Sequence, residues 1–170
     1  MGHCVRRSGP AFDGSNIRRE GAGMDLNEQI LLEAAQEIWS TTLEMQVTLA
    51  EADNNGHGWM TACLQLTGAW NGAVVLECSS PLARKAIAKM FMMEEGVCSP
   101  EELRDGLGEL GNMIAGKVKS MVPGPTQQSL PSVTEGSDYQ VSVPGSKLTH
   151  EVHLQSEGLP FRLRVLRKEG

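Results

Sequence analysis

The sequence predicts an α+β domain in which long helices pack on one antiparallel sheet. Apolar residues recur at helical spacing in three segments, and runs typical of strands lie between and after these segments. Glycine-containing turns join neighbouring strands, as expected of hairpins. The predicted order is one helix, three strands, two helices and three strands.

The chain length and composition favour one domain with an N-terminal extension. The 170 residues are 40% apolar, which suits a single compact core. Residues 1–23 are rich in Gly, Arg and Ser and show no periodicity, so we expect them to be disordered. The pattern changes abruptly at Met24, which is therefore a candidate translation start. The predicted domain spans residues 24–170.

Charge and cysteine usage exclude several classes of partner. The net charge is −6 with scattered Lys and Arg, so we expect no nucleic acid and no membrane surface as partner. The four cysteines form no CxxC pair, which favours reduced thiols over a metal site. No apolar run approaches the roughly 20 residues that span a bilayer, so we expect a cytoplasmic protein.

The first half of the domain reads as a helix, three strands and a second helix. A period of three to four residues predicts a helix from Asn27 to Leu43. Three strand-like runs follow, at 43–51, 58–68 and 70–79. A turn from Gly68 to Gly72 predicts a hairpin between the last two. The next helix, 79–93, begins with a serine cap and Pro81 at its first position.

The second half opens with the longest predicted helix, 99–121. Ser99 is its expected cap, Pro100 suits its first turn, and Glu101 and Glu102 complement the positive end of the helix dipole. Three further strands are predicted at 127–136, 150–158 and 161–169. A short turn, Gly158-Leu159-Pro160, is expected to join the last two.

The long helix is predicted to have two unlike faces. At about 100° per residue, the core-facing residues are Leu103, Leu107, Leu110, Gly111, Ile114, Val118 and Met121. The exposed face carries Glu102, Asp105, Glu109, Asn112, Gly116 and Ser120.

Glycine is unexpected inside this helix, because each one costs roughly 0.5–1 kcal/mol relative to alanine. Gly111 would allow close packing, whereas Gly116 would leave a bare surface beside Asn112 for a docking partner.

The exposed face has two other interpretations. Acidic residues on a helix face commonly do no more than contact solvent. Alternatively, Glu102, Asp105 and Glu109 could bind Mg²⁺. A straight helix spreads these carboxylates over several turns, which disfavours a shared ion. We therefore expect no metal bound by this chain.

The string "DGLGELGNMIAG" resembles the signature helix of the CheC/CheX/FliY chemotaxis phosphatases. Their pattern is Asp or Ser, three residues, Glu, two residues and Asn, which here falls on Asp105, Glu109 and Asn112. The order of elements from residue 24 to 168 is similar to the CheX-like single domain. One departure is the family's proline, whose position is occupied by Glu135 while the nearest proline is Pro131.

The resemblance implies a phosphatase that removes phosphate from the phospho-aspartate of CheY-like response regulators in chemotaxis or related two-component signalling. Asn112 would orient the attacking water, since its amide can both donate and accept hydrogen bonds. Glu109 would pair with the active-site lysine of the regulator. Asp105 and Gly116 are candidate partner contacts. The resemblance places Mg²⁺ in the regulator.

The resemblance also implies a homodimer. The alternative function is a non-catalytic adaptor of the same fold, which would dock a response regulator or a flagellar switch component.

Overall fold

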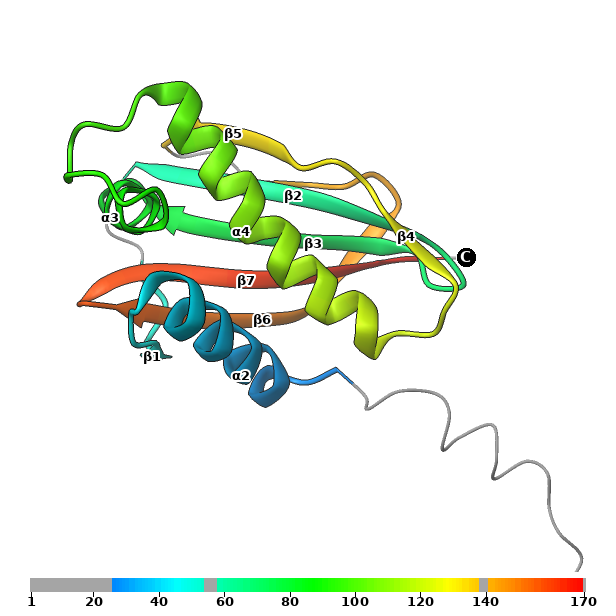
Figure 1. Cartoon of the computed structure of the whole chain (residues 1–170). Coiled ribbons are helices and arrows are strands. Elements are labelled where there is room, and N and C mark those ends of the chain that lie inside the picture. The colour runs from blue at the N-terminus through cyan, green and yellow to red at the C-terminus, as the bar shows by residue number, and fades with distance from the viewer. Residues whose placement is uncertain (1–25, 54–57, 138–140, 170) are drawn as a thin grey trace, which may run out of the picture.

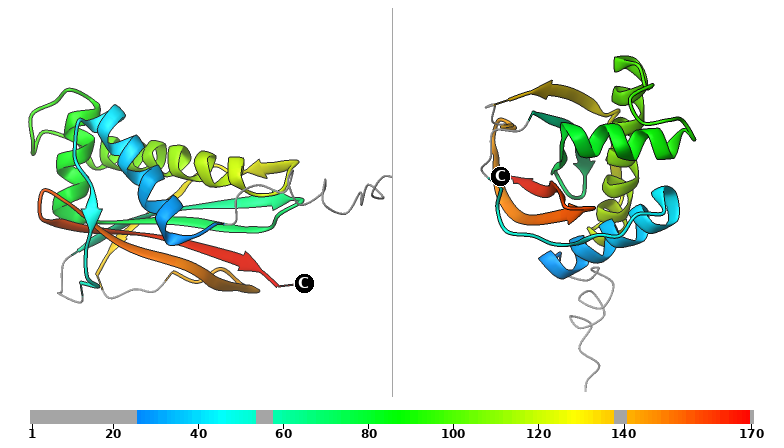
Figure 2. Two further views of the ribbon diagram at one scale, coloured as in Figure 1. Left: turned by 90° about the horizontal axis from the view of Figure 1, so that it is seen from below. Right: turned by 90° about the vertical axis from the view of Figure 1, so that its left-hand side faces the viewer.

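The protein forms two layers, one of strands and one of helices. The computed structural model describes residues 26–53, 58–137 and 141–169. The predicted extension 1–23 and Met24 lie outside the described residues. A single antiparallel sheet carries three α-helices on one of its faces (Figures 1 and 2). The predicted α+β fold is confirmed.

The helices are α2 (Glu28–Ile38), the π-helix η1 (Trp39–Leu43), α3 (Ser80–Met90) and α4 (Pro100–Met121). The strands are β1 (Thr48–Leu49), β2 (Trp59–Gly68), β3 (Gly72–Ser79), β4 (Thr126–Gln128), β5 (Ser132–Gly136), β6 (Ser146–Ser156) and β7 (Leu159–Lys168). The sheet order is β1-β6-β7-β3-β2-β4, and β5 also pairs with β2. Every pairing is antiparallel.

The strand predicted at 43–51 is wrong in its extent. Leu43 ends η1, and only Thr48 and Leu49 pair with another strand, β6. Met45 and Val47 are buried at alternate positions, but neither belongs to a strand. Strand length depends on whether a neighbouring strand runs alongside, and the alternating pattern does not contain that information.

The two long hairpins follow the prediction, with one corrected turn. β2 and β3 pair from Trp59↔Ser79 to Leu66↔Gly72, which confirms the predicted hairpin. β6 and β7 turn at Glu157 and Gly158, whose φ angles of 50° and 75° suit a two-residue hairpin loop. Pro160 therefore lies in β7 and not in the turn.

The strand predicted at 127–136 is two short strands. β4 pairs Gln128 with Leu66, whereas β5 pairs Ser132 with Cys63, so the register gains one residue between them. Leu130 and Pro131 therefore lie opposite one residue of β2, Leu64, and Leu130 is 90% exposed. A proline cannot donate a ladder hydrogen bond, so Pro131 suits the interruption. The result is a bulge between β4 and β5, in the chain segment that pairs with β2.

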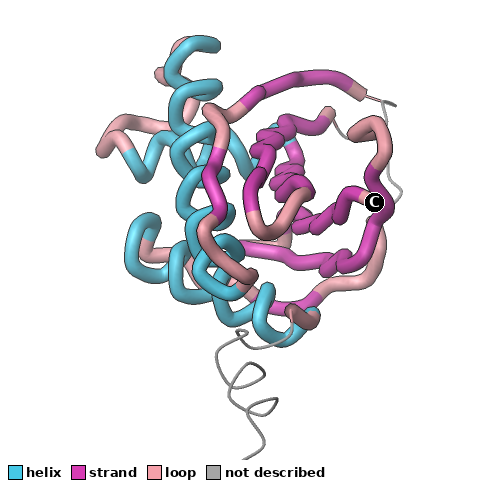
Figure 3. Tube along the Cα trace, turned by 90° about the vertical axis from the view of Figure 1, so that its right-hand side faces the viewer, coloured by secondary structure: helices cyan, strands magenta, loops and turns pink. Residues whose placement is uncertain are grey.

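The main core lies between the sheet and the helices. α4 crosses β2 and β3, while α2 lies over β6 and α3 packs against α4 (Figures 1 and 3). Trp39 of η1 is fully buried and stacks on Phe161 of β7 with ring centroids 4.5 Å apart. Among the described residues, no helix is both long enough and apolar enough to cross a membrane.

The opposite face of the sheet carries a buried ionic cluster. Glu77 of β3 is only 3% exposed and accepts a hydrogen bond from Arg162. Arg164 lies 3.6 Å from Glu77 and donates to Glu151 of β6 at 2.9 Å. The guanidinium of Arg162 also lies over the ring of Trp59. These contacts tie β2, β3, β7 and β6 together on this face.

Candidate functional site

α4 begins where the sequence predicts, because its first turn is capped. The Ser99 side chain accepts a hydrogen bond from the backbone N–H of Glu102 at 3.1 Å, and the Glu102 carboxylate accepts from the Ser99 N–H at 2.7 Å. This reciprocal capping box satisfies two backbone donors that the helix itself leaves unpaired. The cap fixes the residue at which α4 begins.

The predicted core face of α4 is buried. Its fully or almost fully buried side chains are Leu103, Leu107, Leu110, Ile114 and Val118, while Met121 is half-buried. A Cβ atom at Gly111 would lie 2.9 Å from Leu64 of β2. A Cβ atom at Gly106 would lie 2.6 Å from Ile87 of α3. These glycines allow α4 to approach both the sheet and α3 closely.

Gly108 lies against Pro131. A Cβ atom at Gly108 would lie 3.1 Å from Cγ of Pro131 and 3.7 Å from Val133. Pro131 thus packs against the helix one residue before Glu109, even though it precedes the family position at Glu135. The bulge at Leu130 places this proline beside the helix.

The opposite face of α4 is open to solvent. Asp105, Glu109, Gly116 and Ser120 are exposed, whereas Asn112 is half-buried. At Gly116, a Cβ atom would meet no neighbouring group of the described residues within 4 Å. Glu102 is half-buried and its carboxylate belongs to the capping box. The structure therefore removes Glu102 from the group of freely available carboxylates.

Glu109 and Asn112 lie together one helical turn apart. Asn112 Nδ2 donates to Glu109 Oε1 at 3.4 Å. On the other side, Gln128 Nε2 of β4 donates to Asn112 Oδ1 at 3.1 Å and to the Asn112 backbone oxygen at 3.2 Å. The amide of Asn112 is thus held between a carboxylate of its own helix and a side chain from the edge of the sheet.

This arrangement can position a small polar molecule at the surface. An asparagine amide has two N–H donors and an oxygen with two lone pairs. Within the part of the chain that the structure describes, the contacts to Glu109 and Gln128 use one donor and one lone pair. One donor and one acceptor of Asn112 are left for a water molecule or a phosphoryl oxygen. No acid or base is required for that role.

The carboxylates of Glu102, Asp105 and Glu109 do not come together as a cation site in the described residues. In the described ranges 26–53, 58–137 and 141–169, no group of three or more His, Cys, Asp or Glu side chains could hold a metal ion. Asp105 and Glu109 lie about one turn apart on a straight helix.

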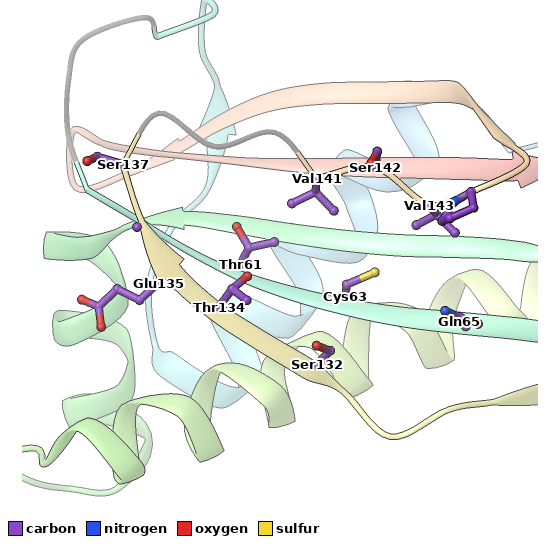
Figure 4. Close-up of a pocket in the computed structure, with 12 residues that line it drawn as sticks. Thr61, Cys63, Gln65, Ser132, Thr134, Glu135, Ser137, Val141, Ser142 and Val143 are labelled. Atoms are coloured by element: carbon purple, nitrogen blue, oxygen red, sulfur yellow. The ribbon is translucent and has the colours of Figure 1, made fainter.

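A separate hollow lies on the other face of the sheet. It is formed by β2, β5 and the segment of Val141 and Val143, with Thr61 and Cys63 in its floor (Figure 4). Glu135 points away from the hollow and contacts Arg84 at 4.0 Å. Burial raises the pKa of the Cys63 thiol, so it is a poor nucleophile. The hollow is lined mainly by hydroxyl and apolar groups and is separate from the α4 face.

A match to a protein-family model shows which family this chain belongs to. Residues 60–155 match the model of the chemotaxis phosphatase CheX, and this range includes all of α4. The chain belongs to the CheX family. The resemblance inferred from Asp105, Glu109 and Asn112 is therefore confirmed at the level of the family. A search of curated protein sequences gives no match.

Solved structures agree with the CheX-family fold. CheX from Desulfovibrio desulfuricans is 20% identical, with 81% of this chain and 95% of that chain covered and a TM-score of 0.65. CheX in a complex with CheY, BeF3 and Mg²⁺ from Borrelia burgdorferi is 17% identical, with 83% and 97% covered and a TM-score of 0.62. The middle domain of FliM from H. pylori is 11% identical, with 83% and 88% covered and a TM-score of 0.53. At these identities, the similarities concern the fold.

Sequence reasoning found Glu109 and Asn112 but missed Gln128. The motif is confined to one helix, whereas Gln128 reaches Asn112 from a strand 16 residues later. The one available signal was the alternation of β4, which directs Gln127 and Gln128 to opposite sides. The roles of Asp105, Glu109, Asn112 and Gly116, like the homodimer, stay predictions.

Proposed function

We propose that this CheX-family protein accelerates hydrolysis of the phospho-aspartate of a CheY-like response regulator. The observation that carries the proposal is the pairing of Glu109 and Asn112 on the exposed face of α4, with the Asn112 amide held at both ends. The match to the CheX family supports the same reaction class.

The reaction requires no nucleophile and no general base from this chain. Water attacks phosphorus, the bond between phosphorus and the aspartyl oxygen breaks, and the products are inorganic phosphate and the aspartate carboxylate. An acyl phosphate has a good leaving group, so holding one water in line supplies much of the acceleration. The remaining donor and acceptor of Asn112 suit that water. The Mg²⁺ that neutralises the phosphoryl oxygens would belong to the regulator.

Glu109 is assigned a docking role. Its exposed carboxylate lies one turn before Asn112, so a lysine of the regulator that pairs with Glu109 would place Asn112 beside the phosphoryl group. A hydrogen bond between charged groups is shorter and stronger than a neutral one. Asp105 and the bare surface at Gly116 extend the same docking face along α4.

The test is the decay of phosphate from CheY-like regulators of the source organism, measured with Mg²⁺ and with or without this protein. Asn112→Ala should lower the catalysed rate about 100-fold or more, because it removes the group that orients the water. Glu109→Gln should mainly raise KM, by about 10-fold or more, because it removes the charge of the docking contact. Ser120→Ala, on the same exposed face, is the matched control.

Full activity of Asn112→Ala would refute the assignment. Circular dichroism and thermal unfolding of each variant separate loss of activity from loss of fold. Removal of Mg²⁺ with EDTA should slow the reaction in every variant, because the ion serves the regulator's phosphoryl group.

A second candidate function is docking without catalysis. The observation that favours it is the open surface at Gly116, which suits a docked partner whether or not a reaction follows. The fold similarity to the FliM middle domain is consistent with this candidate. Binding of a regulator with an unchanged rate of phosphate loss would support docking over catalysis.

A further inference from the structure

The CheX family motif supplies one long contact that can orient the Asn112 amide, the 3.4 Å hydrogen bond from Asn112 Nδ2 to Glu109. The two ends of an asparagine amide are nearly equal in shape but opposite in hydrogen bonding, one being a donor and the other an acceptor. A half-turn about the last side-chain bond exchanges them. Orientation of a water by Asn112 therefore requires neighbours that distinguish oxygen from nitrogen.

Gln128 makes that distinction through its side-chain nitrogen, which contacts two oxygens of Asn112. Its Nε2 donates to the Asn112 backbone oxygen at 3.2 Å and to Asn112 Oδ1 at 3.1 Å. A backbone oxygen can only accept. If the Gln128 amide were turned round, its Oε1 would face the backbone oxygen and repel it. The backbone of α4 thus sets the orientation of Gln128.

The orientation of Gln128 then sets that of Asn112. The nitrogen of Gln128 presents a hydrogen to the Asn112 amide, so the Asn112 oxygen must face it. The Asn112 nitrogen consequently faces Glu109, whose carboxylate accepts the hydrogen bond. An acceptor at each end of this series allows one arrangement of the two amides.

The strand that carries Gln128 is anchored on both sides of the residue. Gln128 pairs with Leu66 in the β2 ladder. The neighbouring Ser129 donates its backbone N–H to Gln65 O at 2.9 Å and accepts from Gln65 N through its hydroxyl at 2.9 Å. Gln127, the residue before, is exposed. The backbone at Gln128 is therefore fixed on β2, which holds the Gln128 side chain at the level of Asn112 on α4.

We propose that Gln128 is a positioning residue, which fixes the orientation of the Asn112 amide and so presents a defined donor and acceptor to the attacking water. This inference rests on the proposed phosphatase function. Gln128 acts through Asn112 and is not itself assigned a contact with the phosphoryl group.

Two substitutions test the proposal in different ways. Gln128→Met keeps the length of the side chain but removes both donors, so the orientation of the Asn112 amide then depends on the 3.4 Å contact to Glu109. Gln128→Glu places an acceptor-only group opposite both the backbone oxygen and Oδ1 of Asn112, so it removes the donor and repels the amide oxygen in its native orientation. We expect kcat to fall about 3–10-fold in the first variant and about 30–100-fold in the second, with KM nearly unchanged. Gln127→Met, on the exposed side of β4, is the matched control.

A readout independent of activity is the pair of side-chain NH2 signals of Asn112 in ¹⁵N NMR spectra. We expect two well-separated proton signals in the wild type and in Gln127→Met, and shifted or broadened signals in both Gln128 variants. Binding of the beryllofluoride-loaded regulator should stay within about 2-fold of the wild type, since the docking contacts remain.

The outcomes separate the two proposals. A fall in kcat at constant KM, together with altered Asn112 signals, supports the positioning role. Wild-type kcat in Gln128→Glu, or unchanged Asn112 signals in both Gln128 variants, overturns it. If the wild-type protein accelerates no regulator, the proposed function fails by itself, and the NMR comparison still decides whether Gln128 sets the amide orientation.

Discussion

The two faces of α4 both contain glycine, but the surroundings of these glycines are opposite. On the buried face, a Cβ atom at Gly106 or Gly111 would lie within 3 Å of Ile87 or Leu64. On the exposed face, Gly116 has no such neighbour among the described residues. Packing explains the first two glycines, because the space is already filled. It does not explain Gly116, for which the proposed docking of a partner supplies a reason.

The largest effect is expected from filling the buried side of the helix. Gly106→Val should lower the free energy of unfolding by about 1–3 kcal/mol, because Ile87 is fully buried and has no room to move. Denaturant titration followed by circular dichroism measures this change. Arg104→Val, two residues earlier on an exposed position, is the control for the propensity of valine and should cost a few tenths of a kcal/mol.

A gain in stability in Gly106→Val, which helix propensity alone predicts because valine is a better helix former than glycine, would show that contact with Ile87 does not govern position 106. The comparison between the two faces would then lose its physical basis.

An effect of opposite sign is expected on the exposed side. Gly116→Ala should raise the free energy of unfolding by about 0.5–1 kcal/mol, because alanine is the better helix former and open space surrounds the position. The melting temperature should rise by about 1–4 °C. If this surface docks a regulator, the same substitution should weaken binding several-fold.

Greater stability with unchanged binding would remove Gly116 from the docking face while leaving Glu109 and Asn112 in place. Lower stability would contradict the open surroundings of position 116. Isothermal titration with the beryllofluoride-loaded regulator provides the binding measurement.

The smallest effect concerns a thiol in the core that α4 helps to cover. Burial raises the pKa of Cys78, and the nearby charge of Glu77 adds to the rise. The reactive thiolate is therefore scarce in the folded protein even at mildly alkaline pH. Iodoacetamide followed by peptide mass spectrometry should leave Cys78 unmodified at pH 8 until denaturant unfolds the protein. Modification in the native state, faster than unfolding, would show that the layer over Cys78 opens locally.

The long helix could be predicted from the sequence because its signals are local. Ser99, Pro100 and Glu102 lie within one turn, and the apolar spacing that follows defines the buried face. The same holds for the hairpin at Gly68 to Gly72, whose strands are neighbours in sequence. Glu109 and Asn112 were accessible for this reason too, as parts of one helical motif.

The edge of the sheet could not be predicted, because it depends on partners distant in sequence. The break between β4 and β5 follows from how each strand pairs with β2. Gln128 pairs with Leu66 and Ser132 pairs with Cys63, so the chain between these two pairs is one residue longer on the side of β4 and β5 than on β2. That break brings Gln128 to Asn112 and Pro131 to Gly108. A shift of one residue would send both side chains elsewhere.

The burial of Glu77 affects which residues of its ionic cluster can be replaced during evolution. Glu77 contacts both Arg162 and Arg164. Arg164 also contacts Glu151, and the guanidinium of Arg162 also lies over Trp59. Loss of either arginine leaves Glu77 with the other, but loss of Glu77 takes from Arg162 its carboxylate partner in this cluster. Breaking a buried ion pair from one side is costly, so neutral substitutions should accumulate at the two arginines first. Among descendants of this sequence, Glu77 should be the last of the three to be replaced.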